Sequence, residues 1–208
     1  MTGPEPLGVT RPAVFLDRDG VINRDRADYV KSWEEFVFLT GVLEALRHLA
    51  DLGWPVVVVS NQAGVARGVV DRSVVDEIHA RMVASVRDAG GQIDEVFFCP
   101  HGPDDACECR KPRPGLLLQA ADRLALDLRA SVLIGDGAND VLAARAVGCS
   151  AVLVKTGRGA EQLDLLRQGG VDGFQVAEDL AEAVEWILSQ EPARFVCGDQ
   201  SLESTENL

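Results

Sequence analysis

Two aspartates stand one residue apart, directly after an apolar run, in the segment VFLDRDG at residues 14–20. Carboxylates this close repel each other unless a cation or a catalytic task holds them together. Asp and Gly are also common turn residues, so a surface turn is the structural alternative. Asp17 and Asp19 are therefore the first candidates for chemistry in this chain.

Three more segments that could do chemistry follow apolar runs later in the chain. They are SNQAG at 60–64, RKP at 110–112 and GDGAND at 135–140. In a parallel sheet, the carboxyl ends of the strands lie along one edge and bind ligands there. Oxygen ligands from Asp17 and Asp136 suit Mg²⁺, which takes one or two carboxylates together with water and substrate phosphate. We therefore expect a magnesium site that shares its pocket with Ser60, Asn61 and Lys111.

These residues also have structural interpretations that need no ligand. Ser60-Asn61 could cap a helix, and Arg110-Lys111 could be a solvated charge pair. Asp136 could lie in an ordinary turn at a strand end. Asp140 could be a helix-terminal carboxylate that the macrodipole stabilises. The functional interpretation depends on all four segments following strands of the same sheet.

A loop rich in cysteine precedes the basic pair at 110–111. Its four potential soft ligands follow the spacing C-x-H, five residues, C-x-C, and they are Cys99, His101, Cys107 and Cys109. Three cysteines and one histidine form a recognised structural zinc site. The loop has no apolar residues beyond alanine and proline, so metal binding would supply its ordering free energy. Free thiols or a single disulfide are the alternatives.

The elements that must position these groups alternate between short apolar runs and longer amphipathic segments. The predicted strands are 13–16, 56–60, 95–98, 132–135 and 151–154. The predicted helices are 42–52, 73–89 with Ser73 as N-cap, 115–126, 138–147, 161–167 and 180–189. This alternation predicts an α/β fold, a three-layer parallel sheet with helices on both faces. His48 and His79, within predicted helices, are expected to be structural or solvated.

Whole-chain properties limit the classes of function. The 208 residues carry a formal net charge of −13, which argues against nucleic acid or an anionic membrane as partner. No apolar run approaches the roughly 18–20 residues that span a bilayer, and the N-terminus lacks the pattern of a signal peptide. We expect a cytoplasmic monomer with a single domain at 1–190 and a polar, disordered tail at 191–208.

The four motifs, taken in order, carry a resemblance. The pattern is DxDGV, a serine at a strand end, Lys-Pro, and GDxxxD. The chain resembles phosphatases of the haloacid dehalogenase superfamily, and "FLDRDGVIN", "SNQAGVARG" and "CRKPRPG" are similar to the heptose bisphosphate phosphatases and the related histidinol phosphatases. The similarity covers about residues 12–157. It implies a Rossmann-like fold with a minimal cap and a small zinc loop.

The resemblance also implies catalytic roles. Asp17 is the expected nucleophile, which attacks phosphorus and forms an aspartyl-phosphate. Asp19 is the expected general acid and base, first for the leaving oxygen and then for water. The Asp17 carboxylate, the Asp19 backbone carbonyl and Asp136 would hold Mg²⁺. Asp140 is expected to support this group of ligands by hydrogen bonding.

Substrate-binding roles follow from the same resemblance. Ser60 and Asn61 would donate hydrogen bonds to the phosphoryl oxygens. Lys111 would neutralise charge on the nucleophile and the transferring group, while Arg110 would bind phosphate. Arg67 would approach the substrate, with a solvated arginine as the alternative. The family also carries a zinc loop, often a longer one.

The substrate is expected to be a small phosphorylated sugar or alcohol. Only about 40 residues separate the first two predicted strands, so no large cap fits between them. The resemblance implies removal of the C7 phosphate of D-glycero-D-manno-heptose 1,7-bisphosphate. Hydrolysis of histidinol phosphate or of some other small sugar phosphate remains an alternative, as does a non-catalytic protein that binds a phosphorylated ligand. Position 137 is glycine, where relatives often have lysine or serine. This difference bears on the identity of the substrate more than on the type of reaction.

Overall fold

Six parallel strands form one sheet in the computed structural model, which describes residues 10–190. The strands are β1 (Val14–Leu16), β2 (Val56–Asn61), β3 (Glu95–Cys99), β4 (Val132–Gly135), β5 (Ser150–Val154) and β6 (Gln175–Ala177). Their order across the sheet is β3-β2-β1-β4-β5-β6. The expected tail at 191–208 lies outside the described residues.

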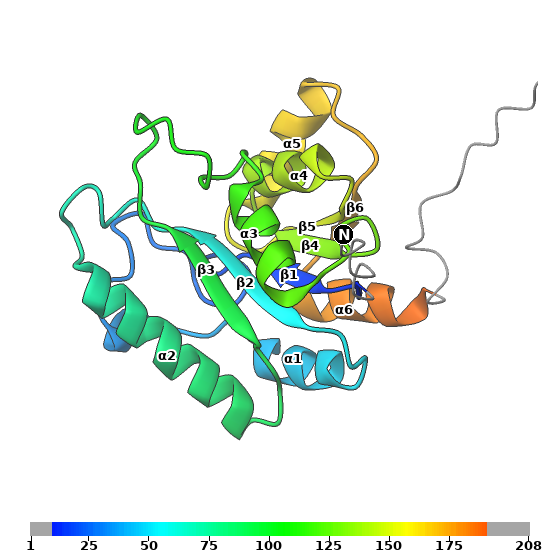
Figure 1. The fold of residues 1–208 in the computed structure, drawn as a ribbon, viewed down its shortest axis with the longest axis horizontal. Helices are drawn as coiled ribbons and strands as arrows, with labels where there is room; N and C mark the ends of the chain where they lie inside the picture. Colours follow the sequence, from blue (N-terminus) through cyan, green and yellow to red (C-terminus); the bar gives the residue numbers. More distant parts are fainter. Residues whose placement is uncertain (1–9, 191–208) are drawn as a thin grey trace, which may run out of the picture.

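Helices cover both faces of this sheet (Figure 1). They are α1 (Val42–Ala50), α2 (Arg72–Asp88), α3 (Gly115–Leu124), α4 (Ala138–Ala146), α5 (Gly159–Gln168) and α6 (Leu180–Ser189), with a short 3-10 helix η1 (Trp33–Glu35). Figure 1 shows α1, α2 and α6 on one face and α3, α4 and α5 on the other. The predicted fold, a three-layer α/β arrangement with a parallel sheet, is confirmed.

The core consists of two apolar layers, one on each face of the sheet. Successive side chains of a strand point to opposite faces, so Val14 and Leu16 of β1 pack with α1, α2 and α6. Phe15, between them, packs on the other face with α3 and α4. All three are fully buried. Strands buried on both faces read as continuous apolar runs, and this is the pattern that predicted them.

Several boundaries differ from the predictions. Strand β6 and helix η1 were not predicted, and α5 begins two residues before the expected Glu161. Ser73 was wrong as the N-cap of α2, because the helix already includes Arg72 and its N-cap is Asp71. The other helices and strands lie within two residues of their predicted limits.

The order of the strands creates the place for a site. From β1 the chain builds β2 and β3 on one side of the sheet, and β4, β5 and β6 on the other. The connections therefore diverge between β1 and β4, which are neighbours with Leu16 opposite Ile134. Ligands bind at such a divergence, beyond the carboxyl ends of the strands. Asp17 follows β1 at this point, and Asp136 follows β4.

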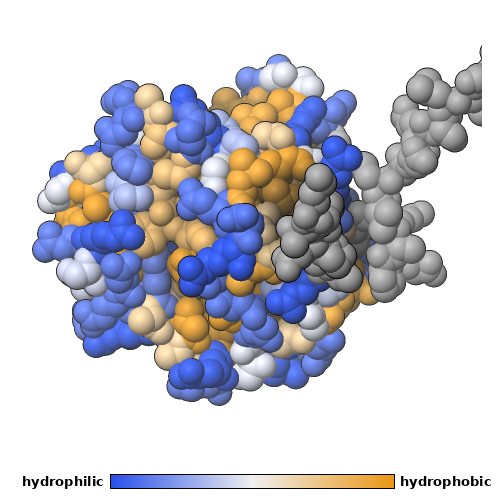
Figure 2. All heavy atoms as spheres, viewed as in Figure 1, coloured by the Kyte–Doolittle hydropathy of each residue, from blue (hydrophilic) through white to orange (hydrophobic). Residues whose placement is uncertain are grey.

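Residues 24–41, between β1 and α1, form a short flap beside this edge of the sheet. Its aromatic side chains pack together, with the rings of Trp33 and Phe36 stacked at 5.0 Å between centroids and Phe38 edge-on to Phe36 at 5.1 Å. Hydrophilic and apolar side chains are interspersed over the face drawn in Figure 2. Among the described residues, no helix combines the length and apolar character needed to cross a bilayer.

Candidate active site

The predicted strand ends meet in one cavity of about 580 Å³. The cavity is lined by Asp17, Asp19, Ser60, Asn61, Arg67, Arg110, Lys111 and Asp140, among others. The Nζ atom of Lys111 lies 3.2 Å from Asp17 Oδ1 and 2.5 Å from Asp140 Oδ1. Lys111 is only 2% exposed, and burial disfavours its charge. The Asp140 and Asp17 carboxylates outweigh burial and raise the pKa of Lys111, so it remains a cation.

Asp136 completes a group of three carboxylates with Asp17 and Asp140. One oxygen from each lies within 4.8 Å of the others. Burial and the nearby Asp17 carboxylate raise the pKa of Asp136 to about 8, and burial raises that of Asp17 to about 6. The Oδ1 atom of Asp136 is buried without a hydrogen-bond partner. A divalent cation bound to these oxygens would offset the repulsion between the carboxylates and would give Asp136 Oδ1 a partner. This group therefore fits the predicted magnesium site.

The Asp19 side chain belongs to a hydrogen-bond network. Its carboxylate accepts bonds from Arg18 Nη2 at 2.8–2.9 Å, Asn23 Nδ2 at 2.9 Å and Gln62 Nε2 at 2.8 Å. Burial alone would raise the pKa of Asp19, but Arg18 and the other donors outweigh it and hold this pKa below its usual range. Asp19 was predicted from its motif, whereas no role was predicted for Arg18 and Gln62.

The remaining predicted residues are in the cavity with different partners. Ser60 is buried, and its Oγ accepts a hydrogen bond from Gln62 at 2.9 Å. The Asn61 side chain bonds to both backbone groups of Lys111, at 3.0 and 3.1 Å, and so anchors the lysine. Its predicted contact with the phosphoryl group stays a prediction. Arg110 contacts the His101 carbonyl at 3.3 Å.

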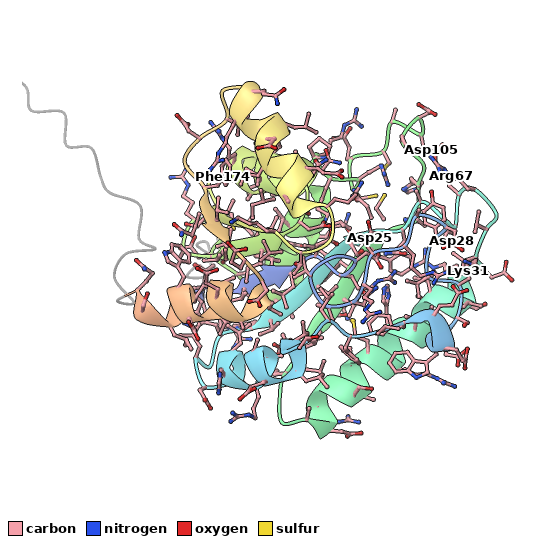
Figure 3. All side chains as sticks on the ribbon, turned by 180° about the vertical axis from the view of Figure 1, so that it is seen from behind. Asp25, Asp28, Lys31, Arg67, Asp105 and Phe174 are labelled. Atoms are coloured by element: carbon pink, nitrogen blue, oxygen red, sulfur yellow. The ribbon has the colours of Figure 1, made fainter. Side chains whose placement is uncertain are left out.

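Arg67 lines the cavity beside Tyr29 of the flap. Its guanidinium lies 5.8 Å from the centre of the Tyr29 ring. Figure 3 shows it on the same side of the molecule as Asp105 of the cysteine loop and Asp28 and Lys31 of the flap. Residues of the flap and of the segment after β2 line the cavity together with Arg110, which directly follows the cysteine loop.

A fifth strand end, the segment after β5, also contributes to the site and was not predicted. Thr156 Oγ1 donates to the Gly20 carbonyl at 2.6 Å, and the Arg158 backbone N–H donates to Asp136 Oδ2 at 2.9 Å. The Arg158 side chain lines the cavity and lies 3.4 Å from Asp25 of the flap. Arg158 thus adds a cation to the lining of the cavity, which also includes Gly137. The Thr-Gly-Arg-Gly run after a predicted strand was the signal in the sequence.

Gly157 is expected to be intolerant of substitution. Its φ is +58°, and an added Cβ would overlap Asp136 Oδ2 and the Gly20 Cα. The Gly157→Ala variant should lose about 1–3 kcal/mol of stability through overpacking and should also lose activity, because Asp136 must shift. Thermal unfolding and phosphate release measure these effects. Gly170→Ala is the matched control, since Gly170 has a similar φ of +68° but open space around its Cβ position. Equal effects at both glycines would contradict this account.

The four predicted zinc ligands form a compact cluster. The Cys107 Sγ atom lies 3.6 Å from both Cys99 Sγ and Cys109 Sγ. The His101 Nδ1 atom lies 3.5 Å from Cys99 Sγ and 3.3 Å from Cys109 Sγ. Zinc bonds of about 2.0–2.3 Å place tetrahedral ligands about 3.3–3.8 Å apart. A disulfide needs about 2.05 Å between sulfurs, and these cysteines are free. The disulfide alternative is therefore wrong, and these four distances match the ligand spacing of a tetrahedral metal site.

Loss of this cluster should disturb the active site as well as the loop. Cys109 is two residues before Lys111, and Arg110 contacts the His101 carbonyl. We expect about one zinc per purified chain. We expect Cys107→Ser to lower the melting temperature, and to lower phosphatase activity by at least about tenfold. Metal analysis and thermal unfolding test this. The matched control is Cys149→Ser, a cysteine outside the cluster. Zinc content far below one equivalent in the wild type would contradict the assignment.

Comparison with known proteins identifies the family. The chain is 42% identical over 180 residues to the D-glycero-beta-D-manno-heptose-1,7-bisphosphate 7-phosphatase of Pseudomonas aeruginosa, and the alignment covers 86% of this chain and 99% of the relative. It is 43% identical to the protein of the same name from Bordetella bronchiseptica, over 85% of this chain and 98% of that one. The chain belongs to the heptose bisphosphate phosphatase family of the haloacid dehalogenase superfamily.

Solved structures agree with this family. The crystal structure of the D,D-heptose 1,7-bisphosphate phosphatase from B. bronchiseptica, complexed with magnesium and phosphate, matches with a TM-score of 0.80 at 43% identity, covering 85% of this chain and 98% of that chain. The Burkholderia thailandensis enzyme matches with a TM-score of 0.67 at 32% identity, covering 86% and 100%. A family model for HAD-hydrolase-like proteins matches residues 108–183. The predicted superfamily is confirmed, and the protein is a phosphatase.

Proposed function

We propose that the protein removes the 7-phosphate of a D-glycero-D-manno-heptose 1,7-bisphosphate through an aspartyl-phosphate on Asp17. One observation carries the proposal. The Asp17 carboxylate points into the cavity with the Lys111 cation 3.2 Å away, next to the group of carboxylates suited to a divalent cation. The relatives named for this reaction support the choice of substrate.

Each residue near Asp17 has a part in the proposed reaction. An oxygen of Asp17 attacks phosphorus and forms the P–O bond, and the bond to the sugar oxygen breaks. Asp19 donates a proton to that leaving oxygen, and then removes one from the water that hydrolyses the aspartyl-phosphate. Lys111 balances negative charge on Asp17 and on the transferring group, because phosphoryl transfer depends mainly on positioning and electrostatics.

Asp17, Asp136 and the Asp19 backbone carbonyl are the proposed Mg²⁺ ligands. When bound, the cation neutralises the carboxylates and the phosphoryl oxygens. Asp140 has a different place, because one oxygen ion-pairs with Lys111 and the other accepts the Gly137 N–H at 3.0 Å. Asp140 therefore supports Lys111 and the first turn of α4 more than the cation, whereas the sequence predicted that it supports the metal ligands by hydrogen bonding.

The basic side chains that line the cavity support a substrate with a second phosphate. Six basic and four acidic side chains line the cavity, although the chain as a whole has a net charge of −13. Arg67, Arg110 and Arg158 come from three different loops. Arginine binds phosphate bidentately, so these residues suit the phosphate that remains on the sugar. Histidinol phosphate lacks this second phosphate and should bind less tightly.

Release of phosphate from a panel of compounds tests the proposed function. The panel contains both anomers of heptose 1,7-bisphosphate, the heptose 1-phosphate, histidinol phosphate and simple sugar phosphates, each with Mg²⁺ and with a chelator. We expect the highest kcat/KM for a heptose bisphosphate and no turnover with the chelator. A preference for histidinol phosphate would contradict heptose bisphosphate as the substrate. Equal rates with and without Mg²⁺ would overturn the proposed mechanism.

The same proposal covers the organisation of the chain. We propose that residues 1–190 act as one unit and that the protein works as a cytoplasmic monomer, without nucleic acid or a membrane as partner. The single sheet of the described residues and the acidic net charge support this view.

A further inference from the structure

One buried arginine sets the direction of a hydrogen-bond network next to the cavity. Arg18 is 1% exposed. Its Nη1 lies 3.0 Å from His79 Nε2, and its Nη2 lies 2.8 Å from Asp19 Oδ2 and 3.1 Å from Gln62 Oε1. A guanidinium has donors only. Every group that faces Arg18 must therefore accept a hydrogen bond.

This constraint determines the orientation of the Gln62 side chain. Because Oε1 faces Arg18, the NH₂ group is the end that faces Asp19 and Ser60. It donates to Asp19 Oδ2 at 2.8 Å and to Ser60 Oγ at 2.9 Å, which uses both of its protons. The Gln62 side chain is buried, so its amide has no freedom to exchange these partners with water.

The orientation of the Gln62 amide also determines the role of the Ser60 hydroxyl, which accepts a hydrogen bond from it. A hydroxyl that accepts one hydrogen bond keeps its own proton for another acceptor. Ser60 lines the cavity beside Asp17. Within residues 10–190, no protein group accepts this proton. The phosphoryl group that enters the cavity is the acceptor it suits.

His79 completes the network from helix α2. Its Nε2 faces a donor and must accept, so the proton of the neutral ring lies on Nδ1. Burial, with the nearby guanidinium, lowers the pKa of His79 to about 3, in agreement with a neutral ring. The ring packs edge-on against Phe98 at 5.2 Å. Arg18 is thus held from one side by His79 and from the other by Asp19 and Gln62.

We propose that Arg18, Gln62 and His79 are positioning residues for the phosphatase reaction. Gln62 directs the Ser60 proton toward the phosphoryl group and, with Arg18, holds the Asp19 carboxylate in place. His79 holds Arg18. The inference deepens the proposed function and rests on a phosphoryl group binding beside Asp17, but not on the identity of the sugar.

A double-mutant cycle on phosphate affinity tests the link between Gln62 and Ser60. The probe is inorganic phosphate, measured by calorimetry in the presence of Mg²⁺. Gln62→Met and Ser60→Ala should each weaken binding by about tenfold or more, and the double variant should bind no more weakly than the worse single variant. The exposed Gln119, changed to Met, is the control that should bind as the wild type does. Thermal unfolding verifies that each variant folds.

A second comparison tests the part played by His79. Gln keeps an acceptor near the position of Nε2, whereas Leu has similar size and no acceptor. His79→Leu should lower phosphate affinity and kcat by about tenfold or more, and His79→Gln should restore most of both. His48→Leu is the matched control, because His48 Nε2 also lies 2.8 Å from an arginine nitrogen but on the exposed surface of α1. This comparison separates hydrogen bonding from simple packing.

The outcomes distinguish the network from the choice of substrate. Additive losses in the cycle, equal effects of Leu and Gln at position 79, or no phosphate binding by the wild type would overturn the network. If the losses of phosphate affinity are coupled but the protein does not hydrolyse heptose bisphosphate, the network is supported and the proposed substrate is wrong. Coupled losses together with rescue by Gln at position 79 are the result that we expect.

Discussion

Replacing Asp17 by asparagine should lower kcat by about 10⁴–10⁶-fold, the loss typical of removing a nucleophile. The amide keeps the size of the side chain but cannot form the bond to phosphorus. Asp17→Asn also removes one carboxylate from a group whose members repel one another. Phosphate release in the presence of Mg²⁺, with thermal unfolding to verify the fold, measures the effect. Turnover near that of the wild type would refute covalent catalysis by this residue.

Asp19→Asn provides the matched comparison within the same motif. Asparagine can still accept from Arg18 but cannot transfer a proton, so kcat should fall by about 10²–10⁴-fold. The second step should be slowed as well, because its water loses the base. Phosphorylated protein should therefore accumulate in Asp19→Asn and not in Asp17→Asn.

Asp136→Asn should make the metal-free protein more stable while it abolishes the dependence on Mg²⁺. The folded-state pKa of Asp136 is about 8, well above the ordinary value of 3.8. A raised acid pKa means that the folded state binds the proton more tightly than the unfolded state. The stability from the protonated group is thus complete below about pH 4 and is lost as the pH rises through about 8.

At pH 8, the neutral amide removes the cost of a buried charge. We expect Asp136→Asn to gain about 1–3 kcal/mol over the metal-free wild type, a rise in melting temperature of roughly 2–10 °C. Mg²⁺ should raise the melting temperature of the wild type but not that of the variant, and activity should fall by at least about 10³-fold. Melting curves at pH 6 and pH 8, with and without Mg²⁺, test this. A variant less stable than the metal-free wild type at pH 8 would contradict the role assigned to Asp136.

The sequence was sufficient to predict most of the sheet and the carboxylates of the site. Buried parallel strands appear as continuous apolar runs, and the runs that lead into Asp17, Ser60 and Asp136 placed these residues at the same edge. Strand β6 was missed because Gln175–Ala177 is only three residues long and its first residue is exposed. Such an edge strand has no continuous apolar run.

The positioning residues could not be predicted, because their contacts join distant parts of the chain. Arg18 and His79 are 61 residues apart, and Arg18 and Gln62 are 44 apart. In the sequence, Arg18 stands between two aspartates and His79 lies in a predicted helix, and neither pattern indicates a contact between them. Their function depends on the direction of hydrogen bonds, which only the packed side chains define.

The covalent intermediate on Asp17 is the most direct test of this account. Asp19→Asn is mixed with Mg²⁺ and heptose 1,7-bisphosphate and quenched in acid, and the peptide that contains residue 17 is weighed by mass spectrometry. We predict that this peptide gains the mass of one phosphoryl group on Asp17 and that a chelator prevents the gain. An unmodified peptide from a variant that still releases phosphate would show that water attacks the substrate directly, without Asp17 as nucleophile.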